Sequence, residues 1–117
     1  MKKWEQLQWY VANKFKELGD KYARPTVGSG NGNENGDVYT EFPFTVECKQ
    51  RTTKDVTIRI AVWEKNKADI PLNSPKLPLV FLENKDGKRF AVLEADDFFE
   101  LLEEKWYSLS SKNKCIA

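Results

Sequence analysis

The sequence predicts an α/β domain in which one mixed β-sheet is flanked by helices. Apolar residues recur with helical spacing near both ends of the chain, short segments between them alternate apolar and polar residues, and turns containing Gly or Pro separate those segments. A length of 117 residues with 40% apolar content allows one core, so we expect a single domain over 1–117. The predicted order of elements is αβββαββα.

The first predicted elements are a helix and a strand at the edge of the sheet. Residues 4–18 carry apolar side chains at spacings of three and four, and Gly19-Asp20 ends this helix. Residues 22–27 are expected to form a short strand, which Pro25 places near an edge because proline cannot donate a ladder hydrogen bond. The following residues 28–36, with the sequence GSGNGNENG, are predicted to form a loop.

Two strands joined by a proline are predicted next, over residues 37–42 and 44–50. In the second of them apolar and polar residues alternate, which gives the strand one apolar and one polar face. If the hairpin is centred at Phe42, Asp37 lies opposite Glu47, with their side chains about 5 Å apart.

A helix and a loop are predicted in the middle of the chain. Residues 52–55 offer helix-capping side chains, and the apolar pattern that follows, as far as Lys65, favours a helix. The β-branched content of residues 56–62 leaves a strand open at that point. Residues 70–78 contain three prolines and are predicted to form a loop.

The last predicted elements are a hairpin and a helix. Residues 79–83 and 89–94 flank Asp86-Gly87, which is a strong turn signal. Residues 96–106 are expected to form a helix capped by its first aspartate, and the polar tail over 108–117 is expected to fray.

Composition excludes several classes of site and location. The chain has no histidine, which removes Ser–His and Cys–His nucleophile pairs and His-ligated zinc. The isolated Cys48 and Cys115 are expected to be reduced thiols in a cytoplasmic protein. Residues 1–5 carry an acid where a signal peptide needs an apolar run, and no transmembrane-length stretch occurs, so we expect no membrane partner. The formal charge of +1 lacks the strongly basic balance that would by itself indicate nucleic acid.

Asp37, Glu47 and Lys49 form the most informative pattern in the chain. Glu47 and Lys49 project from the same side of a strand, and the hairpin brings Asp37 to them. Two carboxylates that close repel each other unless a cation lies between them. Mg²⁺ suits such a pair because it prefers hard oxygen ligands, and the backbone carbonyl of Cys48 is a further candidate ligand. Lys49 can orient or activate the attacking water, so the pattern predicts metal-dependent phosphodiester hydrolysis.

The same three residues have a simpler interpretation. Glu and Lys two apart on an amphipathic strand are common, and with Asp37 they can form a solvated network of ion pairs. In that case the chain is a non-catalytic binding module. Metal dependence distinguishes the two interpretations.

The motifs together resemble the PD-(D/E)xK nuclease superfamily, and within it the archaeal and phage Holliday junction resolvases. The resemblance covers most of residues 4–106, and Gly36 stands where the family usually has proline. Its motifs are the first-helix acid, two glycine-containing segments and the strand that bears Glu-x-Lys: Glu5, Gly28-Ser29-Gly30, Gly36-Asp37-Val38 and Val46-Glu47-Cys48-Lys49-Gln50-Arg51.

The resemblance implies a restriction-endonuclease-like core and a set of site residues. Asp37 and Glu47 correspond to the family's metal ligands, Lys49 to its catalytic lysine, and Glu5 to the first-helix acid that completes the site. For Glu5, a helix-start acid favoured by the macrodipole is an equally good interpretation. The implied cofactor is Mg²⁺, for which Mn²⁺ is expected to substitute.

The implied activity is resolution of four-way DNA junctions by a homodimer, in DNA recombination and repair. Such a junction has two-fold symmetry, so two equivalent sites would make the paired nicks. Another nuclease of the superfamily, of restriction or end-processing type, stays open as an alternative. The candidate DNA contacts are Ser29, Gly30, Arg51 and Lys54, although for any one basic residue a role in solubility is the simpler interpretation. A compact stand-alone nuclease of this kind would fit a phage or a microbe.

Overall fold

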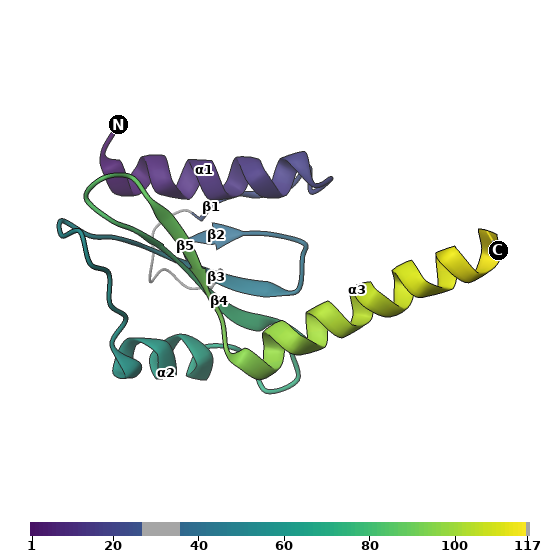
Figure 1. The fold of residues 1–117 in the computed structure, drawn as a ribbon. Coiled ribbons are helices and arrows are strands. Elements are labelled where there is room, and N and C mark those ends of the chain that lie inside the picture. Colours follow the sequence, from purple (N-terminus) through teal and green to yellow (C-terminus); the bar gives the residue numbers. More distant parts are fainter. Residues whose placement is uncertain (27–35, 117) are drawn as a thin grey trace.

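A five-stranded sheet with strand order β1-β2-β3-β4-β5 forms the centre of the computed structural model (Figure 1). The structure describes residues 1–26 and 36–116, with the side chains of the last helix described as far as Lys105. Its elements are α1 (Lys3–Glu17), β1 (Arg24–Pro25), β2 (Val38–Tyr39), β3 (Phe44–Gln50), α2 (Ile60–Ala68), β4 (Leu77–Glu83), β5 (Arg89–Val92) and α3 (Ala95–Ile116).

The sheet is mixed, as the sequence predicts. The neighbouring strands are antiparallel except β3 and β4, which run parallel and are joined through α2. A parallel pair needs such a crossover because the chain must return to the same end of the sheet before the second strand begins. The predicted class and the predicted order of elements, αβββαββα, are confirmed.

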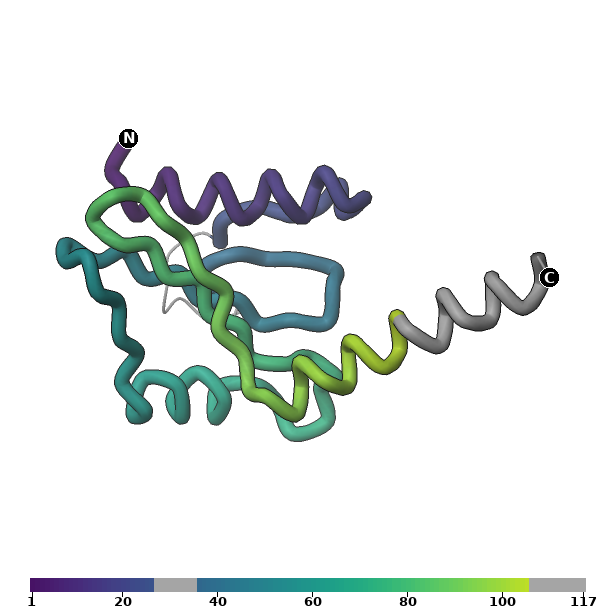
Figure 2. The backbone as a smooth tube through the Cα atoms, viewed as in Figure 1, coloured from purple at the N-terminus to yellow at the C-terminus, as the bar shows by residue number. Residues whose placement is uncertain are grey.

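The two faces of the sheet are covered by different helices (Figures 1 and 2). On one face, α1 packs against the sheet in the main core. On the other, Trp63 of α2 packs against Val80 and Leu82 of β4. Because side chains alternate along a strand, β3 directs Cys48 into the main core and Glu47 toward the α2 face. The buried residues of the main core are Leu7, Val11, Ala12, Phe15, Ala23, Val38, Val46, Cys48 and Leu79.

The strands β1 and β2 are shorter than the predicted ranges of 22–27 and 37–42. After Tyr39 the chain leaves the sheet because the Thr40 hydroxyl and the Glu41 amide both donate hydrogen bonds to Asp20, at 2.7 Å each. Asp20 is buried and also accepts a hydrogen bond from the Tyr22 amide, at 3.1 Å. These contacts replace the ladder hydrogen bonds that would have lengthened β2.

The helix α2 confirms the helical interpretation of the middle segment but begins later than predicted. Residues 52–55 do not cap it. They form a loop in which the Thr53 and Lys54 carbonyls accept hydrogen bonds from the Lys85 amide and the Asn84 side chain, at 3.0 and 3.1 Å. The loop is therefore attached to the turn between β4 and β5, and Arg59 precedes the first turn of α2 without a side-chain cap.

Further boundaries differ from the predictions, among them the end of β5, which is Val92 and not residue 94. The strand β4 begins at Leu77 and includes Pro78, which the sequence placed in the preceding loop. Proline is tolerated there because it lies next to the start of the strand. The helix α3 continues to Ile116, through the tail that was expected to fray, and leads away from the sheet (Figure 1). Within residues 1–26 and 36–116, no helix combines the length and the apolar character needed to cross a membrane.

Candidate active site

The register of the β2–β3 hairpin brings Asp37 and Glu47 together. Val38 pairs with Val46, which is the register of a hairpin centred at Phe42, as the sequence predicts. The backbone amide of Asp37 donates a hydrogen bond to the Val46 carbonyl at 2.7 Å and so continues the pairing past the end of β2. Asp37 and Glu47 therefore lie opposite each other, on the sheet face that α1 does not cover.

Gly36 sets the path by which the chain enters this pair. Its φ is +85°, a conformation that favours glycine, and a Cβ atom added there would lie 2.5 Å from the Val46 carbonyl oxygen. Proline, whose φ is fixed near about −65°, could not adopt this backbone. The backbone path at this point therefore favours glycine.

The Asp37 carboxylate is held by the neighbouring strand. Its Oδ2 atom accepts a hydrogen bond from the Cys48 amide at 2.8 Å. Since the N–H and C=O of one residue in a strand point to the same side, the Cys48 carbonyl is also directed toward β2. The carbonyl that the sequence offers as a metal ligand therefore lies on the same side of β3 as Asp37.

Glu47 has a strongly perturbed acidity. Burial raises its pKa from an ordinary value of 4.5 to about 7, helped by the negative charge of Asp37 and by a hydrogen bond between the two carboxyl groups. The ammonium group of Lys49 opposes this rise, so its charge acts on the same pair. Near neutral pH the two carboxyl groups consequently hold a proton that a cation between them would displace.

Asp69, at the end of α2, is a residue that sequence analysis did not connect with the site. Its negative charge further raises the pKa of Glu47. Asp69 follows Glu47 by 22 positions in the sequence, and no motif in the neighbouring residues connects the two. Only the crossover through α2 brings its charge near β3.

The thiol of Cys48 takes no part in the face that carries Glu47. It is buried in the main core, and that burial, with the charges of Asp37 and Glu47, raises its pKa far above the usual range. A thiol in this state is not a nucleophile at neutral pH. The contribution of Cys48 to the site is confined to its backbone atoms.

Glu5 does not join the two carboxylates. It lies in the first turn of α1, where its Oε1 atom accepts a hydrogen bond from the Lys2 amide at 3.3 Å. Over residues 1–26 and 36–116, no group of three or more His, Cys, Asp or Glu side chains is close enough to hold a metal ion. The described site is therefore a pair of acids with a lysine.

The candidate DNA contacts fall into two groups. Ser29 and Gly30 lie outside the described residues. Arg51 follows β3 directly, and its amide donates a hydrogen bond to the Glu83 carbonyl at 2.8 Å. Lys54 is exposed on the loop that is attached to the β4–β5 turn. Both cations thus lie just beyond Lys49 along the chain.

Comparison with known proteins assigns the chain to no family. The sequence matches no family model, and searches of curated proteins and of solved structures find no significant match. The classification that the structure supports is accordingly an α/β fold with one mixed five-stranded sheet.

Proposed function

We propose that the chain is a metal-dependent DNA nuclease of the PD-(D/E)xK type with a restriction-endonuclease-like core. One observation carries the proposal: Asp37 and Glu47 face each other across a hairpin, beside the charge of Lys49, and the pKa of Glu47 is raised to about 7. Strongly perturbed acids on a partly covered face are typical of functional sites.

The residues present fit Mg²⁺, with Mn²⁺ as a substitute. Asp37 and Glu47 supply carboxylate oxygens and Cys48 a carbonyl oxygen, which are hard ligands. Mg²⁺ is commonly held by one or two carboxylates together with substrate phosphate, so a pair of acids is sufficient without Glu5. Burial, and after it the charge of Asp37, raises the pKa of Glu47, and a bound cation would oppose both effects by favouring the ionised carboxylates.

Each residue of the site then has a defined task. When bound, Mg²⁺ supplies Lewis-acid stabilisation of the charge that develops on the phosphoryl oxygens. The Cys48 amide fixes the orientation of the Asp37 carboxylate through its hydrogen bond. Lys49 places a positive charge next to Glu47, where it orients the attacking water or offsets developing negative charge. Arg51 and Lys54 contact phosphates of the bound strand.

Within this class, the substrate that we propose is a four-way DNA junction, resolved by a homodimer. A second copy would supply the equivalent site that paired nicks require. Such an enzyme would act in DNA recombination and repair in the cytoplasm, or in the host cytoplasm if it is encoded by a phage.

The helix α3 offers a surface for that second copy. Its first turns expose Phe98, Phe99 and Leu102 by 47%, 61% and 50%. The two phenylalanine rings contact each other edge to face, with centroids 5.3 Å apart, and so form one apolar patch. Phe99→Glu should convert a dimer to monomers in analytical ultracentrifugation, whereas an unchanged sedimentation coefficient would exclude this patch as the interface.

The test of activity is cleavage of a labelled four-way junction with Mg²⁺ and with EDTA. Asp37→Asn is the sharpest variant, because an asparagine oxygen can still accept the Cys48 hydrogen bond while the charge is lost. We expect cleavage to disappear in EDTA and in Asp37→Asn, with junction binding retained. Asp86→Asn, which makes the same change at an exposed acid in the β4–β5 turn, is the matched control and should cut normally.

The outcomes separate the alternatives. Cleavage that is independent of metal and of Asp37 would contradict the proposed site, and binding without any cleavage would favour the non-catalytic module. A linear duplex of the same sequence distinguishes the nucleases. Equal cutting of duplex and junction would exclude a junction resolvase and leave a nuclease of restriction or end-processing type.

A further inference from the structure

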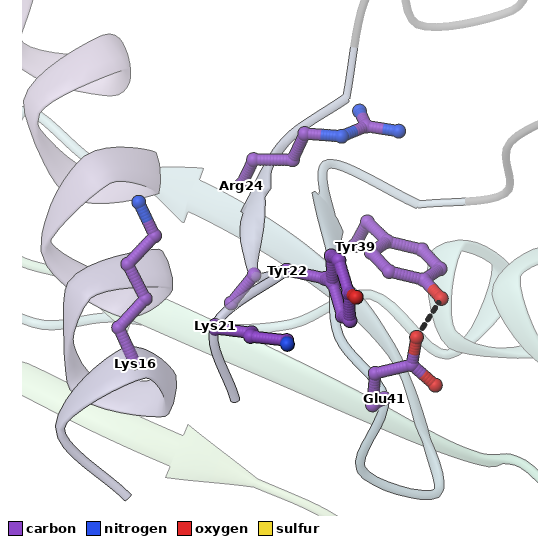
Figure 3. Close-up of a pocket in the computed structure, with 7 residues that line it drawn as sticks. Lys16, Lys21, Tyr22, Arg24, Tyr39 and Glu41 are labelled. Atoms are coloured by element: carbon purple, nitrogen blue, oxygen red, sulfur yellow. Dashed lines mark hydrogen bonds between the residues drawn. The ribbon is translucent and has the colours of Figure 1, made fainter. Parts of the chain in front are cut away.

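A second charged surface lies at the β1–β2 edge of the sheet, separate from the acid pair. It is a hollow of about 580 Å³ between the end of α1 and the edge strands (Figure 3). We call it the edge groove. Apart from the buried Ala23, six residues line it, and they come from α1, from the segment before and within β1, and from β2 and its end: Lys16, Lys21, Tyr22, Arg24, Tyr39 and Glu41.

Positive charge dominates the edge groove. Lys16, Lys21 and Arg24 are exposed basic residues, and Glu41 is the one acid among the six. The Glu41 carboxylate accepts a hydrogen bond from the Tyr39 hydroxyl at 2.8 Å (Figure 3). This acid is therefore directed to a tyrosine rather than to the lysines.

Aromatic rings stand between the cations. The Lys21 ammonium lies 5.1 Å from the centre of the Tyr22 ring, and the Lys76 ammonium lies 5.2 Å from that of Tyr39. Tyr22 is 58% exposed, so most of its ring is accessible to a ligand. Tyr39 is half-buried, and the Arg24 guanidinium also lies over its ring, 5.5 Å from the centre, so a base would stack there by displacing a cation. Cations interleaved with accessible aromatic rings are the features with which proteins bind single-stranded nucleic acid, through phosphate contacts and base stacking.

The edge groove adjoins the acid pair along β2. Tyr39 lies two residues after Asp37, and side chains two apart in a strand project from the same face, about 6.5 Å apart. Arg24 pairs with Tyr39 in the β1–β2 register. Because Lys16 belongs to α1 and the acid pair lies on the face that α1 does not cover, a nucleic-acid strand bound in the groove reaches Asp37 by passing around the β1 edge of the sheet.

We propose that the edge groove binds an unpaired segment of a nucleic-acid strand, with phosphates at Lys16 and Lys21 and a base stacked on Tyr22 or Tyr39. A paired base cannot offer its face to a tyrosine ring, because its neighbours in the duplex cover it. The placing of this segment beside a cleavage site rests on the proposed nuclease function. The binding itself does not, since none of these residues belongs to the acid pair.

The test measures the binding of a fluorescent oligothymidylate of about 12 nucleotides by its fluorescence anisotropy. EDTA is present so that the oligonucleotide is not cut. For Lys16→Gln/Lys21→Gln we expect weaker binding and a salt dependence whose slope falls by about 1.4, as for two lost phosphate contacts. The matched control is Lys65→Gln/Lys105→Gln, which removes the same charge from exposed sites on α2 and α3. It should change neither quantity by a comparable amount.

Aromatic variants test the stacking. Tyr22→Leu should weaken binding by about 5- to 100-fold if a base stacks on this ring. Trp4→Leu, at an exposed aromatic on the first turn of α1, is the control and should bind normally. At the other ring, Tyr39→Phe keeps the stacking surface and should bind like the wild type, whereas Tyr39→Leu should not.

Three results would overturn the inference: no binding of the oligothymidylate by the wild type, equal losses in the control lysine variant, or full affinity in both Tyr22→Leu and Tyr39→Leu. Losses confined to the lysine variant, with heparin binding reduced to the same extent, would mean a general polyanion surface and would also overturn it. Asp37→Asn should keep the affinity for the single strand. The cleavage assay therefore tests the nuclease proposal, and the binding assay tests the proposal for the edge groove independently of it.

Discussion

The β2–β3 hairpin carries a carboxylate arrangement at each end, and the two are built in opposite ways. At the turn, Asp20 accepts hydrogen bonds from the Thr40 hydroxyl and the Glu41 amide, at 2.7 Å each. At the open end, Glu47 faces a second carboxyl group, that of Asp37. One acid is thus surrounded by donors, and the other is paired with a group of its own charge.

The consequence for acidity is opposite at the two ends. Burial acts to raise the pKa of Asp20, but its hydrogen bonds from Thr40, Glu41 and Tyr22 outweigh this effect and lower the pKa below 3.8. At Glu47, burial and the charge of Asp37 act together and raise the pKa to about 7. Asp20 therefore stabilises the folded chain as an anion, whereas the ionised form of Glu47 is disfavoured in the folded chain.

The largest expected effect is on catalysis at the open end. Glu47→Gln should lower the rate of junction cleavage by about 1,000-fold, equivalent to about 4 kcal/mol of transition-state stabilisation. Its melting temperature should stay the same or rise, because the variant removes repulsion with Asp37. Single-turnover cleavage and thermal melting of the same sample measure both quantities. A variant that cuts normally would show that the Glu47 carboxylate is not needed for cleavage. A variant that unfolds would show that Glu47 is a structural residue.

At the turn end of the hairpin, a substitution of Asp20 should lower stability and leave the cleavage rate nearly unchanged. Asp20→Ala should lower the free energy of unfolding by about 2–4 kcal/mol, because it leaves the buried Thr40 hydroxyl and the Glu41 amide without their acceptor. The single-turnover rate of the molecules that remain folded should change little. Urea denaturation gives the first quantity. A stability loss below about 1 kcal/mol would contradict the assigned role of Asp20.

Stability should depend on pH with opposite sign at the two carboxylates. The folded-state pKa of Glu47 is raised, so without metal the wild type should lose about 2 kcal/mol relative to Glu47→Gln as pH rises from about 4.5 to about 7. The folded-state pKa of Asp20 is lowered, so the advantage of wild type over Asp20→Asn should shrink as pH falls below the ordinary value. Parallel pH profiles for the two variants would refute the contrast.

Gly36 links the core to the open end. Gly36→Ala places a Cβ atom 2.5 Å from the Val46 carbonyl oxygen and requires an L-residue at a φ of +85°. We expect a loss of about 1–3 kcal/mol in unfolding free energy and slower cleavage, because Asp37 must shift with its neighbour. Gly87→Ala is the matched control: it has a similar φ of +82°, but no atom lies within 4 Å of its added Cβ. Equal losses of unfolding free energy in the two variants would show that the close approach of Gly36 to the Val46 carbonyl is not the cause.

The smallest effect is expected at Cys48. Cys48→Ala keeps the backbone amide that binds Asp37 and removes only a buried thiol, so stability should fall by about 1 kcal/mol and cleavage should be unchanged. In the native protein the Cys48 thiol, separated from that of Cys115 by peptide mapping, should resist iodoacetamide, because its pKa is raised and it is buried. Rapid alkylation, or loss of cleavage in the alanine variant, would contradict a purely backbone role.

The parts of the fold that depend on local pattern were predictable. The alternation of apolar and polar residues over 44–50 predicts the strand and the sheet face on which Glu47 lies. The hairpin centre at Phe42 predicts the register that places Glu47 opposite Asp37. These predictions needed only neighbours in the chain, because strand periodicity and a short hairpin determine them.

What the sequence did not predict depends on contacts between distant residues. Asp20 shortens β2 by binding Thr40, 20 positions away, and Asn84 holds the loop at Lys54, 30 positions away. The edge groove likewise combines residues from α1, β1 and β2, and no local motif marks it. Sequence spacing cannot anticipate such contacts, because they form only when the sheet is assembled.

The most direct test of the central claim is an NMR titration of the Glu47 side-chain carboxyl carbon, in metal-free protein and with Mg²⁺. We expect a midpoint near pH 7 without metal. With saturating Mg²⁺ it should move down, because a cation between the carboxyl groups favours their ionised forms. A midpoint near the ordinary 4.5 in metal-free protein, or one that Mg²⁺ leaves in place, would contradict a divalent-metal site at Asp37 and Glu47.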